Sequence, residues 1–362
     1  MECVMKLSRC FTKGKHQVLS ALLFSTLSLS VAYQANAAET FTFATNTAVS
    51  GLRGEAEKGF IDRLEKVSNG NIKIVPYWGG SLLKGNEVLD GVKNGIADIG
   101  FININYYPTR LLLNSAFQLF PEGPVSFDGK MELYKEIYKK IPQLNQEFAA
   151  QGQKIIYTYA YLPYAFISRD TLNSTDDLKD KRIRASSRWL LNIIKDMQAT
   201  PVSIPWSDTY QALDSGTIDG VVTNYDSMHR IGMDQIAPNI LTTQKLWAAV
   251  PVLLTMNLDK WNSLSPEMQG YFNQAQQQAS IDFGHYYENL FNTIVKLEKK
   301  AGYHVKAATT EEIQQFVELP AIKENKQLWL EQAKQKHAKA PEAMLDKMEE
   351  VIDNALAQDK QS

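Results

Sequence analysis

The chain has 362 residues, with 38 Lys and Arg against 40 Asp and Glu, so its formal net charge at pH 7 is −2. This near balance gives no basic surface for phosphates, and we expect no nucleic-acid partner. The two cysteines, Cys3 and Cys10, both lie close to the N-terminus. The rest of the chain therefore excludes disulfides, a catalytic thiolate and cysteine-based metal sites.

Residues 1–37 have the pattern of a cleavable export signal. Basic residues between positions 6 and 15 precede an apolar run at 18–33, and Ala35 and Ala37 then give the small-x-small spacing of a signal-peptidase site. The run is shorter than the about 20 residues that a spanning helix needs, although an uncleaved anchor is the alternative. Cleavage would leave 362 − 37 = 325 residues in a periplasm-like compartment, enough for two domains.

After the signal, strand-like and helix-like segments alternate. Strands are predicted at 41–44, 71–78 and 96–103, and helices at 55–70 and 86–95. The alternation returns after Gly152, with strands predicted at 154–160, 182–186, 201–205 and 219–224 and helices at 187–198 and 207–216. Because βαβ units join parallel strands, this order predicts an α/β protein with mostly parallel sheets.

Two nine-residue segments repeat one pattern. GIADIGFIN at 95–103 and GTIDGVVTN at 216–224 both read Gly, two residues, Asp, four residues, Asn. Asp98 and Asn103 are thus matched with Asp219 and Asn224. The match can mean that the two segments are placed analogously in two similar units, or it can be a chance similarity, since a match this short also arises by chance.

A single long helix is predicted from Pro266 to Ala301. Ser265 offers an N-cap and Pro266 suits the first helical position. No further proline follows within about 36 residues, roughly 54 Å of helix. Such a helix can brace two lobes, or it can be a pair kinked near Gly284. Amphipathic C-terminal helices follow and are expected to pack against a lobe, with binding of a partner as the alternative.

Arg182 and Arg184 lie two apart in the predicted strand 182–186. In an open α/β sheet, ligands bind beyond the carboxyl ends of the strands, where helix N-termini supply free N–H groups. Arg184 lies nearer that end, beside a helix cap, and its planar guanidinium can hold a carboxylate through two parallel hydrogen bonds. The alternative is an ion pair with Asp177 or Asp180, which we favour for Arg182.

Other polar and aromatic residues are placed near the same end of the sheet. Trp206 precedes Ser207, a predicted N-cap, and can either cover the body of a ligand or lie in the core. Tyr210, one turn on, can add a hydroxyl. Asn103 and Asn224 follow their strands and can supply amide contacts from opposite sides, although asparagine is also an ordinary turn residue.

Patterns for catalysis are missing from the sequence beyond the signal. The histidines there have no metal-ligand spacing; these are His229, His285, His304 and His337. There is also no GxSxG, no phosphate loop and no GxGxxG after a strand. We therefore predict that the protein is not an enzyme and that it has neither a cofactor nor a metal site. A catalytic pair of distant carboxylates is the alternative.

Residues 177–224, DLKDKRIRASSRW to GVVTN, resemble the solute-binding proteins of tripartite ATP-independent periplasmic (TRAP) transporters, the DctP-like family. That family has a K-x-R strand whose last arginine grips the ligand carboxylate, an aromatic before a Ser-x-x-Tyr helix start, and an Asp-Gly before a ligand-contacting strand. Here these features fall on Arg184, Trp206, Ser207, Tyr210 and the pair 219–220. Residues 69–101 are similar to the family as well, so the resemblance covers nearly the whole mature chain.

The resemblance implies two α/β lobes, each a mixed sheet flanked by helices, and a long helix that spans both. The first lobe would comprise residues 38–160 with a return segment at about 250–288. The second would comprise 161–249 with the C-terminal helices at about 289–362. The lobes would close around an organic acid.

The resemblance also implies roles for single residues. Arg184 would anchor the ligand carboxylate, Trp206 would stack on its body, and Asn103 and Asn46 would contact it from the first lobe. Sialic-acid-type members have a second arginine upstream of the anchor, where this chain has Tyr164. A small or medium carboxylate with an apolar or aromatic body is therefore expected.

One position of the second lobe is left open. Where sialic-acid-type members have an asparagine shortly after Asp-Gly, this chain has Thr223 and then Asn224. Successive residues of a strand point to opposite faces, so either residue can face the ligand.

The function implied is that of a monomeric periplasmic receptor that binds an organic acid and delivers it to TRAP membrane subunits. One alternative is the substrate-binding protein of an ABC importer, which should lack a single long helix across both lobes. The other is a periplasmic enzyme acting on organic acids, which would turn over the compound that it binds.

Overall fold

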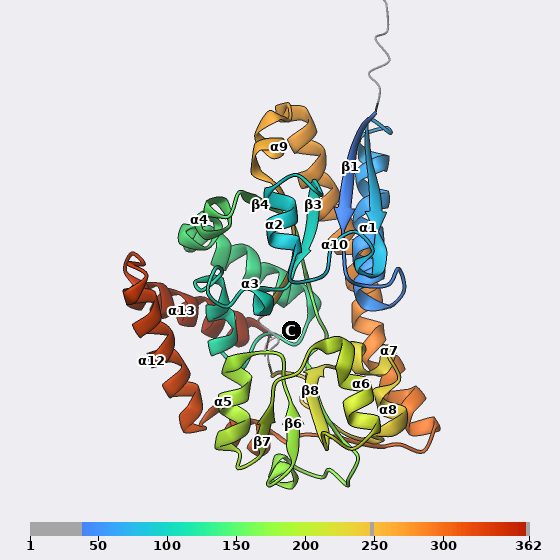
Figure 1. Ribbon diagram of the computed structural model, residues 1–362, viewed down its shortest axis with the longest axis vertical. Helices are drawn as coiled ribbons and strands as arrows, with labels where there is room; N and C mark the ends of the chain where they lie inside the picture. The colour runs from blue at the N-terminus through green and yellow to red at the C-terminus, as the bar shows by residue number, and fades with distance from the viewer. Residues whose placement is uncertain (1–37, 247–249, 360–362) are drawn as a thin grey trace, which may run out of the picture. The chain divides into compact units, whose positions relative to one another are not determined.

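Two β-sheets organise the computed structural model, which describes residues 38–246 and 250–359 (Figure 1). The described residues all lie in one unit that begins at Ala38. The predicted signal at 1–37 lies outside them. No helix in the described ranges has the length and apolarity needed to cross a bilayer.

The first sheet has the strand order β2-β1-β3-β10-β4. In that order the strands are Ile72–Tyr77, Glu39–Ala44, Ile99–Ile102, Pro251–Asn257 and Gln153–Ala160. β1 runs parallel to β2 and β3, whereas β10 is antiparallel to both β3 and β4. The prediction of a mostly parallel sheet is wrong here, because the chain comes back from the second sheet through β10.

The second sheet has the strand order β11-β9-β5-β8-β6-β7. In that order the strands are His304–Ala307, Asn239–Thr242, Tyr164–Ser168, Gly220–Asn224, Arg182–Arg184 and Thr200–Val202. β5 is antiparallel to β8 and β9, and the other pairs are parallel. β5, β9 and β11 were not predicted. All five residues of β5 are buried, so it lacks the alternation of a half-exposed strand. The implied fold, two mixed sheets flanked by helices, is confirmed.

Helices surround both sheets (Figure 1). The predicted helices at 55–70, 86–95, 187–198 and 207–216 correspond to α1, α2, α5 and α6. The helices are α1 (Gly51–Val67), α2 (Val88–Lys93), α3 (Phe127–Lys140), α4 (Pro142–Ala150), α5 (Arg188–Asp196), α6 (Trp206–Asp214), α7 (Tyr225–Arg230), α8 (Met233–Ile236), α9 (Leu258–Ser263), α10 (Pro266–Lys300), α11 (Thr310–Val317), α12 (Pro320–Gln335) and α13 (Pro341–Asp359).

The long helix α10 runs without a break for 35 residues. Ser265 caps it by accepting a hydrogen bond from Met268 N at 3.2 Å, as predicted. α10 contacts α1 and β4 at the first sheet and α7 and β11 at the second, so the bracing interpretation is confirmed (Figure 1). Gly284 makes no kink. A Cβ there would lie 2.9 Å from a ring carbon of Phe127, so the glycine lets α3 approach closely.

The repeated Gly-Asp-Asn pattern marks equivalent strand pairs in the two sheets. Asp98 Oδ2 accepts hydrogen bonds from Thr42 N and Oγ1 at 2.7 and 2.8 Å, which joins the start of β3 to β1. Asp219 Oδ2 accepts from Arg182 N and Nε at 2.8 and 3.0 Å, which joins the start of β8 to β6. The surface partner of Arg182 is therefore Asp219 and neither of the two acids that we expected.

The C-terminal helices are not confined to the second sheet. α12 packs against α5, but Trp329 Nε1 also donates to Leu112 O at 2.7 Å. α13 lies along α3, and Asp359 at its end accepts from Ser126 Oγ at 2.6 Å. α13 of the segment 289–362 therefore contacts α3, which belongs to the predicted first lobe, and the lobe boundaries stay a prediction. Its buried face, which includes Met348, is covered by α3.

Aromatic packing holds α1 and α10 against the first sheet. Phe60 of α1 stacks on Tyr157 of β4 with ring centroids 4.7 Å apart, and Phe272 of α10 meets Phe41 of β1 edge-on at 5.9 Å. Each such pair adds about 0.5–1.5 kcal/mol beyond the burial of its area. The helix α1, which carries Arg53 in its first turn, is thus held against the first sheet.

Candidate ligand-binding site

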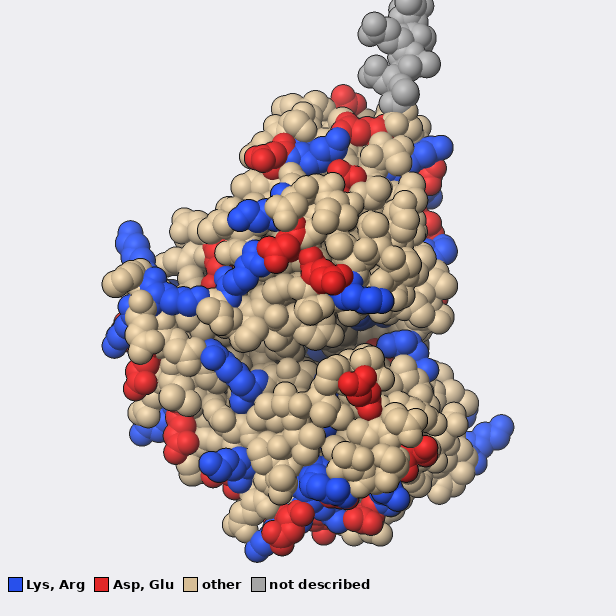
Figure 2. Space-filling model, in the orientation of Figure 1, with Lys and Arg blue, Asp and Glu red and all other residues tan. Residues whose placement is uncertain are grey.

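A cavity of about 360 Å³ is lined by residues from both sheets and their connections. On the face drawn in Figure 2 the surface is hollowed between the two sheet regions. Pockets of this volume suit small organic ligands. The first sheet region contributes Asn46, Arg53, Asn103, Asn105, Tyr106, Gln118 and Tyr161, and the second contributes Tyr164, Arg184, Ser186, Trp206, Thr223, Asn224, Ser227 and Arg230.

Arg184 ends β6 and is only 4% exposed. Its Nε and Nη2 donate to the carbonyl oxygen of Ile204 at 3.3 and 3.2 Å. These bonds use two of the five N–H groups of a guanidinium, and no carboxylate of the described residues pairs with it. Ser187 caps the following helix by accepting a hydrogen bond from Trp189 N at 3.2 Å. Arg184 thus lies where a strand ends and a helix begins, with donors to spare.

Burial lowers the pKa of Arg184, and Tyr106 and Tyr164 partly offset this effect. An arginine remains charged nevertheless, because its ordinary pKa is far above neutral. A buried charge that has lost its water and found no protein anion is costly. The site therefore favours a ligand that brings a negative charge.

Trp206 lies beside this guanidinium. The guanidinium carbon of Arg184 is 5.4 Å from the centroid of the indole, which is half-buried and lines the cavity. Of the two interpretations left open, the ligand-facing one agrees with this position. The predicted cap is wrong, because α6 begins at Trp206 after Pro205, and Ser207 Oγ instead donates to Asp208 Oδ1 at 2.9 Å.

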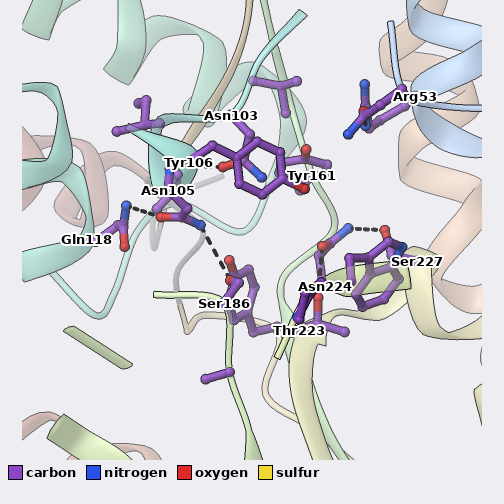
Figure 3. A pocket seen from close by; sticks show the side chains of 18 of the residues that line it. Arg53, Asn103, Asn105, Tyr106, Gln118, Tyr161, Ser186, Thr223, Asn224 and Ser227 are labelled. Carbon is purple, nitrogen blue, oxygen red and sulfur yellow. Dashed lines mark hydrogen bonds between the residues drawn. The ribbon is translucent and has the colours of Figure 1, made fainter. Parts of the chain in front are cut away.

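Arg53, on α1, enters the cavity from the other side (Figure 3). It donates to Asn46 Oδ1 at 2.9 Å, to Thr45 Oγ1 at 3.1 Å and to Glu57 Oε1 at 3.0 Å. Its guanidinium also stacks 3.4 Å from the ring centroid of Phe101. Desolvation lowers the pKa of Arg53, but the charge of Glu57 and nearby tyrosines outweighs it, so the pKa is raised. Arg53 is a fixed cation with a built-in counter-charge.

Arg230, at the end of α7, is the third arginine of the lining. No side-chain hydrogen bond or ion pair joins it to another described residue. Burial lowers the pKa of Arg230, and the negative charge of Asp226 partly offsets this effect. Its side chain passes over the start of α1, since a Cβ added to Gly51 would lie 2.5 Å from Arg230 Cδ. Gly51 also has a positive φ of 81°, so the position requires glycine on both counts.

The lining therefore holds three arginines and, among the described residues, no aspartate or glutamate. Two buried acids lie behind it. Glu57 pairs with Arg53, and Asp226 accepts from Asn224 Nδ2 at 3.0 Å. Burial raises the pKa of Asp226. The balance of charge facing the cavity is positive and favours an anion.

A row of amides and hydroxyls crosses the cavity (Figure 3). Asn103 Oδ1 accepts from Asn105 N at 3.0 Å, and Gln118 Nε2 donates to Asn105 Oδ1 at 2.5 Å. Asn105 Nδ2 then donates to Ser186 Oγ at 3.4 Å. Because Ser186 follows β6, this last bond joins the connections of the two sheets directly.

Thr223 and Asn224 both line the cavity. β8 ends at Asn224 and α7 begins at Tyr225, so the strict alternation of strand side chains stops here. Thr223 Oγ1 donates to Asn224 Oδ1 at 3.2 Å, and Asn224 Nδ2 donates to Ser227 Oγ at 2.7 Å (Figure 3). Both residues can therefore face a ligand, and both stay predicted contacts.

The sequence matches the family model DctP, described as bacterial extracellular solute-binding protein family 7, over residues 43–336. The chain belongs to this family of TRAP periplasmic solute-binding proteins. The ectoine-binding periplasmic protein TeaA of Halomonas elongata is 25% identical over 269 residues, which cover 73% of each chain. The long helix α10, which the substrate-binding protein of an ABC importer should lack, is present.

Solved structures of the family share the fold. A TRAP solute-binding protein from Rhodoferax ferrireducens, in complex with copurified benzoate, has a TM-score of 0.77 at 18% identity and covers 88% of this chain and 99% of its own. DctP6 of Bordetella pertussis, which binds pyroglutamic acid, has a TM-score of 0.73 at 22% identity and covers 86% and 100%.

Of the eight residues proposed from the sequence, the cavity brings together seven. They are Asn46, Asn103, Tyr164, Arg184, Trp206, Thr223 and Asn224. Tyr210 is not among the lining residues and is 38% exposed. It shares a face of α6 with Trp206 but lies about 6 Å further along the helix axis, beyond the cavity.

Sequence reasoning missed two of the three arginines. Arg53 lies in the segment TNTAVSGLRG that follows the first strand, and Arg230 lies six residues after Asn224. Both follow strand ends at the ligand side of a sheet, which is the signal that could have found them.

Proposed function

We propose that the protein is the extracytoplasmic receptor of a TRAP transporter and binds one organic acid in this cavity for delivery to the membrane symporter. The observation that supports it most is the buried Arg184, which lacks a carboxylate partner among the described residues. Each charge-assisted hydrogen bond to a ligand carboxylate contributes about 1.5–3 kcal/mol. The protein binds its ligand without changing it.

The proposed ligand is a small carboxylate with a ring or another apolar body. Its carboxylate lies at Arg184, and its body lies against Trp206, Tyr164 and Tyr106. The names of relatives agree with this size, since ectoine, benzoate and pyroglutamate are small rings that carry a carboxylate. Arg53 of the first sheet region and Arg230 of the second can take a second polar or anionic group.

A direct test compares acids with matched neutral analogues. The compound that co-purifies is identified by mass spectrometry, and a thermal-shift screen of small organic acids extends the set. Isothermal titration then compares the best acid with its primary amide, which keeps the body and removes the charge. We expect the amide to bind about a hundredfold more weakly or worse. Equal affinities would contradict a carboxylate anchor.

The matching protein variants are Arg184→Ala and Arg182→Ala. Arg184→Ala is expected to abolish measurable binding, whereas Arg182→Ala should bind as the unmodified protein does, because Arg182 is bound to Asp219 at the surface. Mass spectrometry of the ligand before and after long incubation tests the enzyme alternative. A new product that forms only when the protein is present would contradict the receptor proposal.

Export and assembly are part of the proposal. The signal at 1–37 directs the protein to the periplasm, so the intact mass of protein recovered there should correspond to a chain that begins at Ala38. The receptor works as a monomer with TRAP membrane subunits. Size-exclusion chromatography with light scattering should give the mass of one chain with and without ligand, and a stable dimer would contradict this part.

A further inference from the structure

A group of three possible metal ligands lies between α7, α8 and α10, away from the cavity. His229, Asp234 and Glu298 each offer one ligand atom, and these atoms lie within 4.8 Å of one another. Asp234 is 2% exposed and Glu298 is 1% exposed. The search for metal-ligand spacing in the sequence missed this group because Glu298 lies on a distant helix.

The group contains two carboxylate oxygens that the fold leaves without a partner. His229 Nδ1 is 2.5 Å from Asp234 Oδ2 and 3.6 Å from Glu298 Oε1, and the hydroxyl of Tyr225 donates to Glu298 Oε2. Asp234 Oδ1 and Glu298 Oε1 are buried and accept no hydrogen bond from any described residue. Buried polar atoms nearly always have a partner, so an exception indicates a bound ion or water.

We propose that this group binds one divalent cation of the zinc class, with a nitrogen of His229 and one oxygen each from Asp234 and Glu298 as ligands. Two carboxylates and a neutral imidazole balance the charge of such an ion. Without a metal ion, Asp234 and Glu298 raise the pKa of His229 to about 9, so a protonated imidazole offsets part of the repulsion between the two carboxylates. A divalent cation would replace that proton. An imidazole ligand favours Zn²⁺ over Mg²⁺ or Ca²⁺, which prefer oxygen alone.

The distances suit this assignment after a small adjustment. Zinc lies about 2.0–2.2 Å from nitrogen and oxygen ligands, so tetrahedral ligand atoms are roughly 3.4 Å apart. The distance from His229 Nδ1 to Glu298 Oε1, 3.6 Å, already fits. The 2.5 Å distance to Asp234 is that of a shared proton and must open by about 1 Å as the metal replaces the proton. Tyr225, by donating to Glu298, orients that carboxylate from outside.

The position of the group connects it with the ligand site. α7 turns Tyr225 and His229 toward Glu298 of α10, while Ser227 and Arg230 of the same short helix line the cavity. A cation bound on the back of α7 would therefore fix the helix that presents Arg230.

The test uses protein without an affinity tag, stripped with a chelator, desalted and titrated with ZnCl₂ by calorimetry. We expect one Zn²⁺ per chain, a higher melting temperature with Zn²⁺, and no comparable response to MgCl₂. Asp234→Asn and His229→Gln should each weaken Zn²⁺ binding about tenfold or more. If Asp234→Asn does not fold, His229→Gln carries the test, since its ring is partly exposed.

The matched control is His285→Gln, which removes an exposed imidazole elsewhere on α10. It should bind Zn²⁺ as the unmodified protein does. Loss of binding in this control, equal binding by Asp234→Asn and the unmodified protein, or less than stoichiometric zinc would each overturn the assignment.

Discussion

The two walls of the cavity each present an arginine with little exposure, but they surround it differently. On the wall next to α1, Arg53 donates to the side chains of Thr45, Asn46 and Glu57. On the wall next to β6, Arg184 donates to the backbone carbonyl of Ile204 and lies beside the indole of Trp206. The first arginine has a counter-charge of its own, and the second does not.

This difference gives the two arginines different roles: Arg53 stabilises the fold, and Arg184 binds the ligand. Pairing with a buried carboxylate offsets the cost of burying a guanidinium, and breaking such a pair is strongly destabilising. A buried guanidinium without a carboxylate adds little to stability but can bind a ligand anion tightly. The comparison leads to four predictions, taken from the largest expected effect to the smallest.

Replacing Arg184 by methionine should affect binding and not folding. We expect affinity for the acid to fall about a hundred- to ten-thousandfold, because two charge-assisted hydrogen bonds are lost. The free energy of unfolding of the ligand-free protein should fall by no more than about 1 kcal/mol, because no buried ion pair is broken. Calorimetry and urea denaturation measure the two quantities. A large loss of stability with retained affinity would reverse the roles given to the two walls.

Replacing Glu57 by glutamine should do the opposite. The change leaves Arg53 buried without its carboxylate and weakens the acceptor of the Tyr159 hydroxyl, which lies at 2.8 Å. We expect the free energy of unfolding to fall by about 3–5 kcal/mol. Glu65→Gln, at an exposed position of the same helix, is the control and should change it by less than about 0.5 kcal/mol. Equal effects of both changes would mean that the pair does not stabilise the fold.

Replacing Trp206 by leucine removes the aromatic face beside Arg184. We expect about a fivefold loss of affinity, on the order of 1 kcal/mol, because the indole both contacts the guanidinium and covers the ligand body. Trp206→Phe should lose less, since it keeps a ring. Calorimetry with the same acid measures both. Unchanged affinity in the leucine variant would mean that the ring does not touch the ligand.

Replacing Tyr210 by phenylalanine should have the smallest effect. The family pattern points to this residue, but it is 38% exposed and does not line the cavity. We expect affinity and stability to change by less than about 0.5 kcal/mol each. A tenfold loss of affinity would show that Tyr210 turns inward when ligand is bound.

Local patterns in the sequence predicted the elements that have a clear period or cap. The helix predicted at 187–198, the cap at Ser265 and the Asp residues before β3 and β8 all rest on short-range signals, and the structure contains each of them. β5 was missed because both of its faces are buried. The placement of α13 on α3 was missed because an amphipathic helix shows that it packs but not on what.

The sequence by itself determined the α/β class, the long α10 and the position of Arg184 at the end of a strand, because each depends on neighbours within a few turns of chain. Only the tertiary structure decided that Arg53 and Arg230 join Arg184 around one cavity, and that Glu298 meets His229. Those contacts depend on how sheets and helices pack. The interaction between two charges depends on their distance in space and not on their separation along the chain.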